Sequence, residues 1–241
     1  MSTETFNKEN LDNILKELGK EYKKLGGKNM PAEIILIGGA AVIENYGFRD
    51  MTTDIDAVIS ASSMMRDAAN NVGERLSLPV GWLNDDFKKT DSYSTKLSEV
   101  SVYYKSFYGA LDVRTVTAEY LIAMKLKAGR KYKNDLSDVV GILAEHKKNG
   151  SEITKEQIFT AIETLYGSAD NIPEDSKAFI TGLLERRNYE AVYDEIRNNE
   201  KVSKTLLVDF EKAYPNTLKT DNVNNILAAL KAKKPKDRGA R

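Results

Sequence analysis

The sequence predicts a mixed α/β (α+β) fold, in which a domain with a mixed sheet is followed by a helical domain. The run from Ile34 to Ile37 is apolar and rich in β-branched residues, which is typical of a strand buried on both faces. Further strand-like segments follow as far as Val116, and amphipathic helical periodicity takes over after Thr117. We therefore expect an α/β domain over 1–117, a helical domain over 118–232 and a basic flexible tail over 233–241.

The composition excludes several classes of protein. The 241 residues suffice for one large domain or two small ones, and the 36 basic and 36 acidic residues balance, so no global field favours nucleic acid or membranes. The absence of cysteine excludes disulfides, thiolate metal sites and cysteine nucleophiles. Because neither an apolar signal region nor a segment of membrane-spanning length is found, we expect a soluble cytoplasmic protein with no membrane partner.

A helix is expected before the first strand. It begins near Asn10 or Asp12, which can cap it, and ends at Gly26 and Gly27. Its single apolar stripe indicates a packing role. The run 27–29 is no Walker A loop, because the upstream glycine and the Ser or Thr of that motif are missing.

Two glycines follow the buried strand. Gly38 and Gly39 have no side chains, so the backbone N–H groups at the start of a short helix predicted over 40–46 can approach an anion closely. The helix dipole favours negative charge at the same place, which makes it suited to a phosphate.

Two carboxylates lie on the next predicted strand, 54–59. Asp54 and Asp56 are spaced two residues apart, so a strand places both on one face. Neighbouring carboxylates repel unless a hard cation lies between them, and Mg²⁺ prefers such oxygen ligands together with substrate phosphates. The alternative is an ordinary βαβ unit with a surface Asp-x-Asp. The preceding glycine pair favours metal-assisted phosphoryl or nucleotidyl transfer.

These residues resemble a known signature. In the polymerase β-like nucleotidyltransferase superfamily, a Gly-Gly or Gly-Ser pair is followed by Asp-x-Asp on a strand, as in Gly38, Gly39, Asp54 and Asp56 here. The closer likeness is to the AbiEii-type and related uncharacterised bacterial (DUF6036-like) nucleotidyltransferases, several of which act as toxins of toxin–antitoxin pairs. The resemblance covers roughly residues 34–143.

The same group often shows Arg-x-Thr-x-Asp-x-Asp. Thr52 keeps its place two residues before Asp54, whereas Arg49 lies one residue further upstream than in that pattern. The resemblance implies nucleotide binding by a set of residues spread over this region: Gly38, Gly39, Arg49, Thr52, Thr53 and Asp138.

The resemblance implies Mg²⁺-dependent transfer of a nucleoside monophosphate from a nucleoside triphosphate (NTP) to an acceptor hydroxyl, with one or two Mg²⁺ ions on Asp54 and Asp56. The acceptor is an RNA such as tRNA, a protein or a small molecule, and an antitoxin protein is a candidate partner. Two alternatives stay open. One is a non-catalytic nucleotide-binding or antitoxin-like protein with the same fold, and the other is a nucleic-acid-binding module that uses the helical half and the basic tail.

A third acidic residue is a candidate catalytic and metal-binding group. Members of the superfamily usually carry a third carboxylate on a later strand, and Asp112 on the strand predicted over 109–116 is the candidate here. Alternation places Asp112 on the same face as Arg114. The alternative is an exposed strand residue that pairs with Arg114.

The helix predicted to begin after Thr117 carries the last catalytic candidate. Lys125 lies among apolar and small residues of this helix, so it needs an anionic partner, which a triphosphate or the carboxylates of Asp54 and Asp56 could supply. Downstream acidic residues resemble an Asp-x-x-Asp pattern of the AbiEii-like group. These residues are Asp135 and Asp138. Asp135 has the alternative role of a helix N-cap. For Asp138, a role in the active site and a purely structural role both stay open.

The single tryptophan begins another candidate segment. Asn84 and Asp85 could contact the nucleotide or support the metal ligands, but we favour a turn there, with Trp82 packed in the core.

Overall fold

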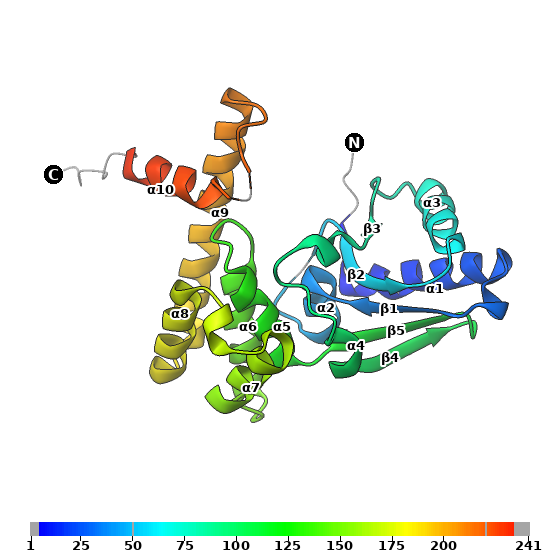
Figure 1. The fold of residues 1–241 in the computed structure, drawn as a ribbon, viewed down its shortest axis with the longest axis horizontal. Helices are drawn as coiled ribbons and strands as arrows, with labels where there is room; N and C mark the ends of the chain where they lie inside the picture. The colour runs from blue at the N-terminus through cyan, green and yellow to red at the C-terminus, as the bar shows by residue number, and fades with distance from the viewer. Residues whose placement is uncertain (1–4, 50, 220, 234–241) are drawn as a thin grey trace.

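The computed structural model describes residues 5–49, 51–219 and 221–233. Its centre is a five-stranded sheet with the strand order β3-β2-β1-β5-β4 (Figure 1). The strands are β1 (Ala32–Leu36), β2 (Ile55–Ser60), β3 (Leu83–Asn84), β4 (Ser101–Phe107) and β5 (Leu111–Val116). β1 pairs antiparallel with β2 and parallel with β5, β3 runs parallel to β2, and β4 is antiparallel to β5. The predicted mixed sheet is thus confirmed.

Helices precede, interrupt and follow the sheet. Those of the α/β part are α1 (Lys8–Lys24), α2 (Gly38–Asn45), α3 (Met64–Leu76) and α4 (Leu97–Val100), with 3₁₀ turns η1 (Gly27–Asn29) and η2 (Asp86–Lys89). The helical part contains α5 (Ala118–Ala128), α6 (Asp135–Lys148), α7 (Lys155–Tyr166), η3 (Ala169–Asn171), α8 (Glu174–Arg186), α9 (Tyr189–Ala213) and α10 (Val223–Lys233).

The first helix begins earlier than the sequence predicted. Asn7 is its N-cap, because the Asn7 side chain accepts from the backbone N–H of Asn10 while the Asn10 side chain accepts from that of Asn7, each at 2.9 Å. This reciprocal capping box satisfies two N–H groups that would otherwise be unpaired at the helix start. Asn10 therefore lies inside the helix that it was expected to begin.

One continuous hydrophobic core joins the two parts of the chain. Ile34 and Leu36 of β1 are fully buried, as predicted for a strand covered on both faces, and the same core includes Ile122 of α5 and Ile158 of α7. Every strand among the described residues precedes Thr117, and α5 to α10 follow it. Because the parts share a core, the division at residues 117 and 118 stays a prediction.

The end of the helical part stands apart from this core. The second half of α9 and α10 project away from the other helices (Figure 1) and form a small cluster of their own around Leu207, Val223 and Leu227. Lys233 ends α10, and the rest of the predicted tail, 234–241, lies outside the described residues. Among the helices that the structure describes, none has the length and apolar character to cross a membrane.

Truncating Leu36 should destabilise the whole fold, because its side chain is fully buried in the central strand. We expect Leu36→Ala to lower the free energy of unfolding by roughly 2 to 5 kcal/mol, measured by urea unfolding. Val80→Ala is the matched control, since Val80 is exposed. An equal effect of the two substitutions would contradict the assignment of β1 to the core.

Candidate active site

The buried strand β1 leads directly into the glycine turn. Gly38 has a φ of 58°, a left-handed conformation that glycine adopts at little cost, and it begins α2. A Cβ atom on Gly38 would lie only 3.1 Å from Oδ2 of Asp56. Because the N-cap residue Ile37 has an aliphatic side chain, it cannot accept from the first N–H groups of α2. The N–H groups at the start of α2 therefore have no side-chain cap and are suited to an anion. They lie beside the Asp56 carboxylate, because Gly38 is close to it.

Gly39 brings two further predicted residues to this turn. A Cβ atom on Gly39 would lie 2.6 Å from Oγ1 of Thr52 and 2.8 Å from Nη2 of Arg49. The structure thus places Arg49 beside the start of α2, although its position in the sequence departs from the family pattern. Thr53 is exposed, and its hydroxyl is 3.4 Å from Oδ1 of Asp54.

The two carboxylates flank the start of β2. Asp54 precedes the strand, and Asp56 lies within it, where its carbonyl accepts a 3.1 Å hydrogen bond from the N–H of Ile37. Burial and the charge of Asp54 raise the pKa of Asp56, whereas a hydrogen bond from Asn84 and the charges of Lys133 and Lys125 lower it. The repulsion between the two carboxylates is what a bound cation would relieve.

Asn84 supports Asp56 from the neighbouring strand. The two residues are register partners in the parallel pair β2–β3. Oδ1 of Asn84 accepts from the N–H of Asp86 at 3.2 Å, so the amide nitrogen is the atom free to donate to Asp56. The turn expected after Trp82 is present, because this contact between Asn84 and Asp86 leads from β3 into η2. The packing expected for Trp82 is confirmed, because its ring is buried and its Nε1 donates to the Ala69 carbonyl at 3.0 Å.

Asp112 does not join the carboxylate pair. Glu33 of β1 is the register partner of both Ser60 and Asp112, so Asp112 is level with Ser60, four residues along β2 from Asp56. Four residues of a strand span about 13 Å. Asp112 is also exposed. Within the described ranges, no three Asp, Glu or His side chains form a group that could hold a metal. The structure therefore leaves Asp54 and Asp56 as the candidate acidic ligands.

Behind the glycine turn, cations and carboxylates alternate in a chain that we call the ion chain. Arg49 donates to Oδ2 of Asp138 at 2.6 Å, and Nζ of Lys125 lies 2.8 Å from the same oxygen. Lys125 also contacts Asp135 at 3.1 Å, and Arg130 donates to the other oxygen of Asp135 at 2.7 Å. Burial alone would lower the pKa of Lys125, but the carboxylates of Asp138 and Asp135 raise it. Burial opposes ionisation of Asp135, yet Lys125 and Arg130 hold its pKa at about 2.

The ion chain changes the roles expected for three residues. Lys125 is buried and does need an anion, but Asp135 and Asp138 supply it rather than Asp54 and Asp56. Asn134, not Asp135, is the N-cap of α6. Asp138 was predicted to bind nucleotide, whereas its carboxylate faces two cations. These differences arise because the sequence does not show that α5 and α6 pack side by side.

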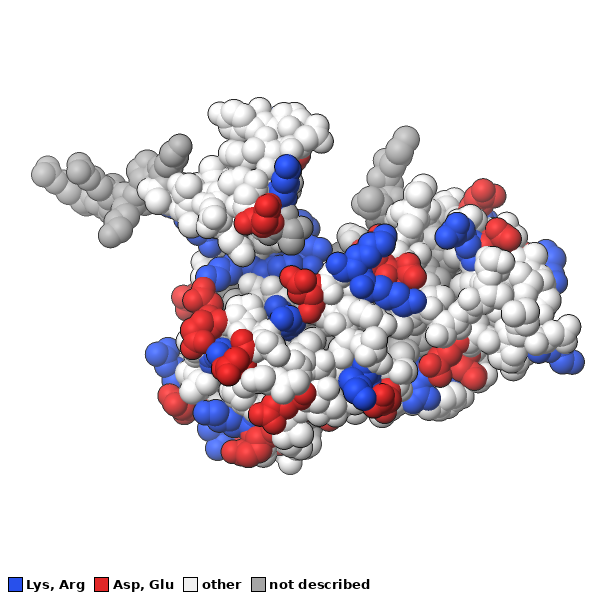
Figure 2. All heavy atoms as spheres, viewed as in Figure 1, with Lys and Arg blue, Asp and Glu red and all other residues white. Residues whose placement is uncertain are grey.

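The charge around the carboxylate pair is predominantly positive. The ion chain has three cations and two carboxylates. Lys133 is a further cation near the pair. Burial and the charge of Arg130 lower the pKa of Lys133, and the charges of Asp56 and Asp54 partly oppose this effect. Figure 2 shows Lys and Arg side chains, with some Asp and Glu side chains beside them, around the hollow where the helical part meets the α/β part. Such surroundings suit a polyphosphate.

The donors available for a metal are all oxygen atoms. Asp54 and Asp56 provide two carboxylates that repel each other, next to a turn suited to phosphate, and this donor set fits Mg²⁺.

Glu200 of α9 contacts the start of α6, next to the ion chain, and the sequence did not predict this contact. Its Oε1 accepts from the N–H groups of Leu136 (2.9 Å) and Ser137 (3.3 Å), and its Oε2 accepts from the Ser137 hydroxyl at 2.5 Å. The pKa of Glu200 is raised to about 7. Burial is the main cause, the charge of Asp138 adds to it, and the hydrogen bonds from Ser137 and Leu136 oppose it. No sequence signal marks one buried Glu on an amphipathic helix.

Glu200 should make stability depend on pH. Between its ordinary pKa of about 4.5 and its folded pKa of about 7, the folded state binds more protons than the unfolded state, so stability falls as pH rises. We expect the free energy of unfolding of the wild type, relative to Glu200→Gln, to decrease from about pH 5 to about pH 8. Urea unfolding across this range measures it, with Glu195→Gln on the exposed face of α9 as control. Parallel pH profiles for wild type and Glu200→Gln would refute the assignment.

Comparison with known proteins places the chain in a family. The family model described as a nucleotidyltransferase of unknown function (DUF6036) matches residues 13–192. Searches of curated proteins and of solved structures gave no match. The matched segment contains the glycine turn, both carboxylates and the whole ion chain. The chain therefore belongs to this family of nucleotidyltransferases of unknown function.

Proposed function

We propose that this protein transfers a nucleoside monophosphate from an NTP to an acceptor hydroxyl, with Mg²⁺ as the metal and pyrophosphate as the leaving group. One observation carries the proposal: the Asp54–Asp56 pair lies beside a helix N-terminus that is kept open by Gly38 and Gly39. Binding of a metal–polyphosphate needs these two features together.

The glycine turn and Arg49 bind the phosphates in this proposal. The first N–H groups of α2 receive phosphate oxygens, and the absence of side chains at Gly38 and Gly39 allows close approach. The Arg49 guanidinium is held in place by Asp138 and by the Met51 carbonyl, to which its Nε donates at 3.2 Å. A guanidinium fixed before the substrate binds stabilises developing negative charge at little reorganisation cost.

Asp54 and Asp56 bind the metal, and Asn84 orients the Asp56 carboxylate through its hydrogen bond. A bound Mg²⁺ ion lowers the pKa of the acceptor hydroxyl and neutralises charge on the phosphates. Lys125 and Lys133 add positive potential near Asp56. These roles assign the acidic groups to the α/β part and the cations to the helical part and Arg49.

The acceptor proposal covers hydroxyls that share this chemistry: an RNA such as tRNA, a protein or a small molecule. The likeness to toxin-type nucleotidyltransferases supports a role as the toxin of a toxin–antitoxin pair, with an antitoxin protein as partner.

Charge-neutral variants of equal size test the metal ligands. We expect Asp54→Asn and Asp56→Asn each to lower the rate of nucleotide transfer roughly 100-fold or more, because each removes one ligand charge. The measurement is incorporation of radiolabel from α-labelled NTP in the presence of Mg²⁺. Asp112→Asn is the matched control and should stay within about twofold of the wild type, since Asp112 lies about 13 Å along the strand. An equal loss in Asp112→Asn would make it the third carboxylate after all.

A non-catalytic nucleotide-binding protein is the second candidate. The separation of Asp112 from the pair favours it, since superfamily enzymes usually carry a third acid. This candidate predicts that the wild type binds Mg²⁺–NTP but gives no labelled product with RNA, protein or small-molecule acceptors.

Gly39→Ala should weaken nucleotide binding. The added methyl group would lie 2.6 Å from Oγ1 of Thr52 and 2.8 Å from Nη2 of Arg49, so it displaces the guanidinium from the turn. We expect the Kd for Mg²⁺–NTP to rise roughly tenfold, measured by calorimetry. Gly182→Ala in α8 is the control, because a Cβ there meets open space. Unchanged affinity in Gly39→Ala would exclude the turn as the phosphate site.

A further inference from the structure

The ion chain depends on the position of α6, since its two carboxylates, Asp135 and Asp138, both belong to the first turn of that helix. The N–H groups of a first turn have no partner within their own helix. In the part of the chain that the structure describes, the N-cap residue Asn134 forms no capping bond through its side chain. The capping groups must therefore come from elsewhere.

Glu200 takes the place of the missing cap. Its carboxylate accepts three hydrogen bonds from Leu136 and Ser137, the two residues between Asp135 and Asp138. The Glu200 side chain is buried, with 3% of the residue exposed, so water cannot readily replace these bonds. Leaving a buried donor unsatisfied is unfavourable, so the contact strongly favours one arrangement of the first turn of α6.

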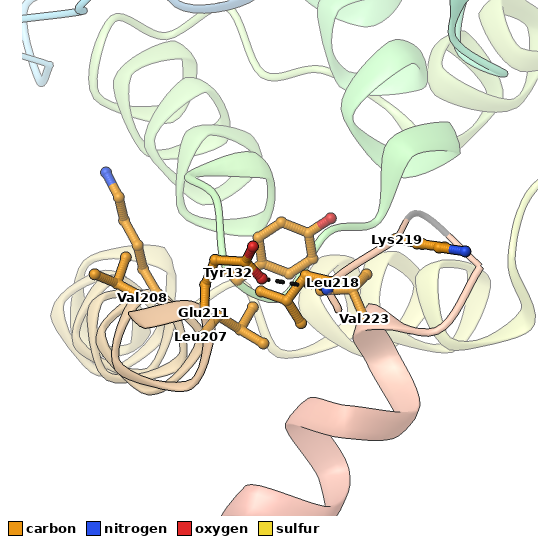
Figure 3. A pocket seen from close by; sticks show the side chains of 8 residues that line it. Tyr132, Leu207, Val208, Glu211, Leu218, Lys219 and Val223 are labelled. Carbon is orange, nitrogen blue, oxygen red and sulfur yellow. Dashed lines mark hydrogen bonds between the residues drawn. The ribbon is translucent and has the colours of Figure 1, made fainter. Parts of the chain in front are cut away.

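A second contact joins α9 to the same segment. Tyr132, in the loop between α5 and α6, packs against Leu207 of α9 and against Leu218 and Val223, which precede and begin α10 (Figure 3). Glu211 of α9 holds the loop before α10 in place by accepting from the N–H of Leu218. Helix α9 thus holds the segment from 132 to 137 at both ends.

We propose that Glu200 is a positioning residue of the nucleotidyl-transfer site: by binding the first turn of α6, it holds Asp135 and Asp138 where they orient Lys125 and Arg49. The inference rests on the proposed function, and it reaches beyond the family match, which ends at residue 192. Glu200 itself contacts α6 and acts only through it.

The test compares four full-length proteins: wild type, Glu200→Leu, Glu200→Gln and the surface control Glu195→Leu. Leu removes all three hydrogen bonds, whereas the Gln carbonyl can still accept from both backbone N–H groups that now reach Oε1. Transfer rates are measured against NTP concentration, the Kd for Mg²⁺–NTP is measured by calorimetry, and amide hydrogen exchange is followed at Leu136 and Ser137.

We expect Glu200→Leu to raise KM and Kd for NTP roughly tenfold and to speed exchange of the two amides, because Arg49 and Lys125 lose their fixed orientation. The KM and Kd of Glu200→Gln should stay within about threefold of the wild-type values, and those of Glu195→Leu should equal the wild-type values. A purely structural role predicts a lower active fraction with unchanged KM and Kd, and that result would overturn the inference.

Three further outcomes are decisive. If Glu200→Leu does not fold, Glu200→Asp keeps the charge but withdraws the carboxylate by one methylene group, which weakens all three hydrogen bonds. An unchanged KM and Kd in that variant would count against the inference. A wild type that binds no NTP would overturn the proposed function together with this inference. A wild type that binds NTP while Glu200→Leu keeps the same Kd would overturn only the role of Glu200.

Discussion

The ion chain from Arg49 to Arg130 is the constraint on which the site depends. Removing one partner of a buried ion pair leaves an uncompensated charge and lowers the free energy of unfolding by roughly 3 to 5 kcal/mol. Each member of the ion chain therefore depends on its neighbours. Its cations come from the loop before β2, from α5 and from the turn before α6, and both its carboxylates come from α6. The ion chain therefore fixes the helical part against the glycine turn, and the shared hydrophobic core joins the same two parts.

This arrangement separates the two kinds of charge that the chemistry needs. Asp56 lies in β2 and Asp54 directly precedes it. Burial and the charge of Asp54 raise the pKa of Asp56, and a bound cation would relieve the repulsion between the two carboxylates. The cations stand on the other side of the turn, where Arg49 is prevented from collapsing onto the acidic pair because Asp138 already binds it. The glycines keep the space between these groups free of side chains. Metal and phosphate can thus be bound side by side without large rearrangement.

The sequence predicted the parts of the site that are local. The buried strand and the glycine turn follow from residue type and periodicity, and the structure has both. The strand that carries Asp56 begins at Ile55, so Asp54, which we expected on that strand, lies directly before it. The contacts between distant elements could not be predicted in this way. The register of β5 decides that Asp112 is remote, the packing of α5 on α6 gives Lys125 its partners, and the approach of α9 places Glu200 at α6. Asn84 was named from the sequence as able to support the metal ligands, but only the pairing of β3 with β2 shows that it is the register partner of Asp56.

The most direct test of nucleotidyl transfer compares two labels in one experiment. Each NTP, labelled at either the α or the γ phosphate, is incubated with the protein, Mg²⁺ and total RNA, cell protein and a panel of small-molecule acceptors. Transfer of a nucleoside monophosphate predicts that the acceptor gains the α label and never the γ label, which appears in pyrophosphate. Acceptors that gain the γ label would show phosphoryl transfer instead, and that result would contradict the account.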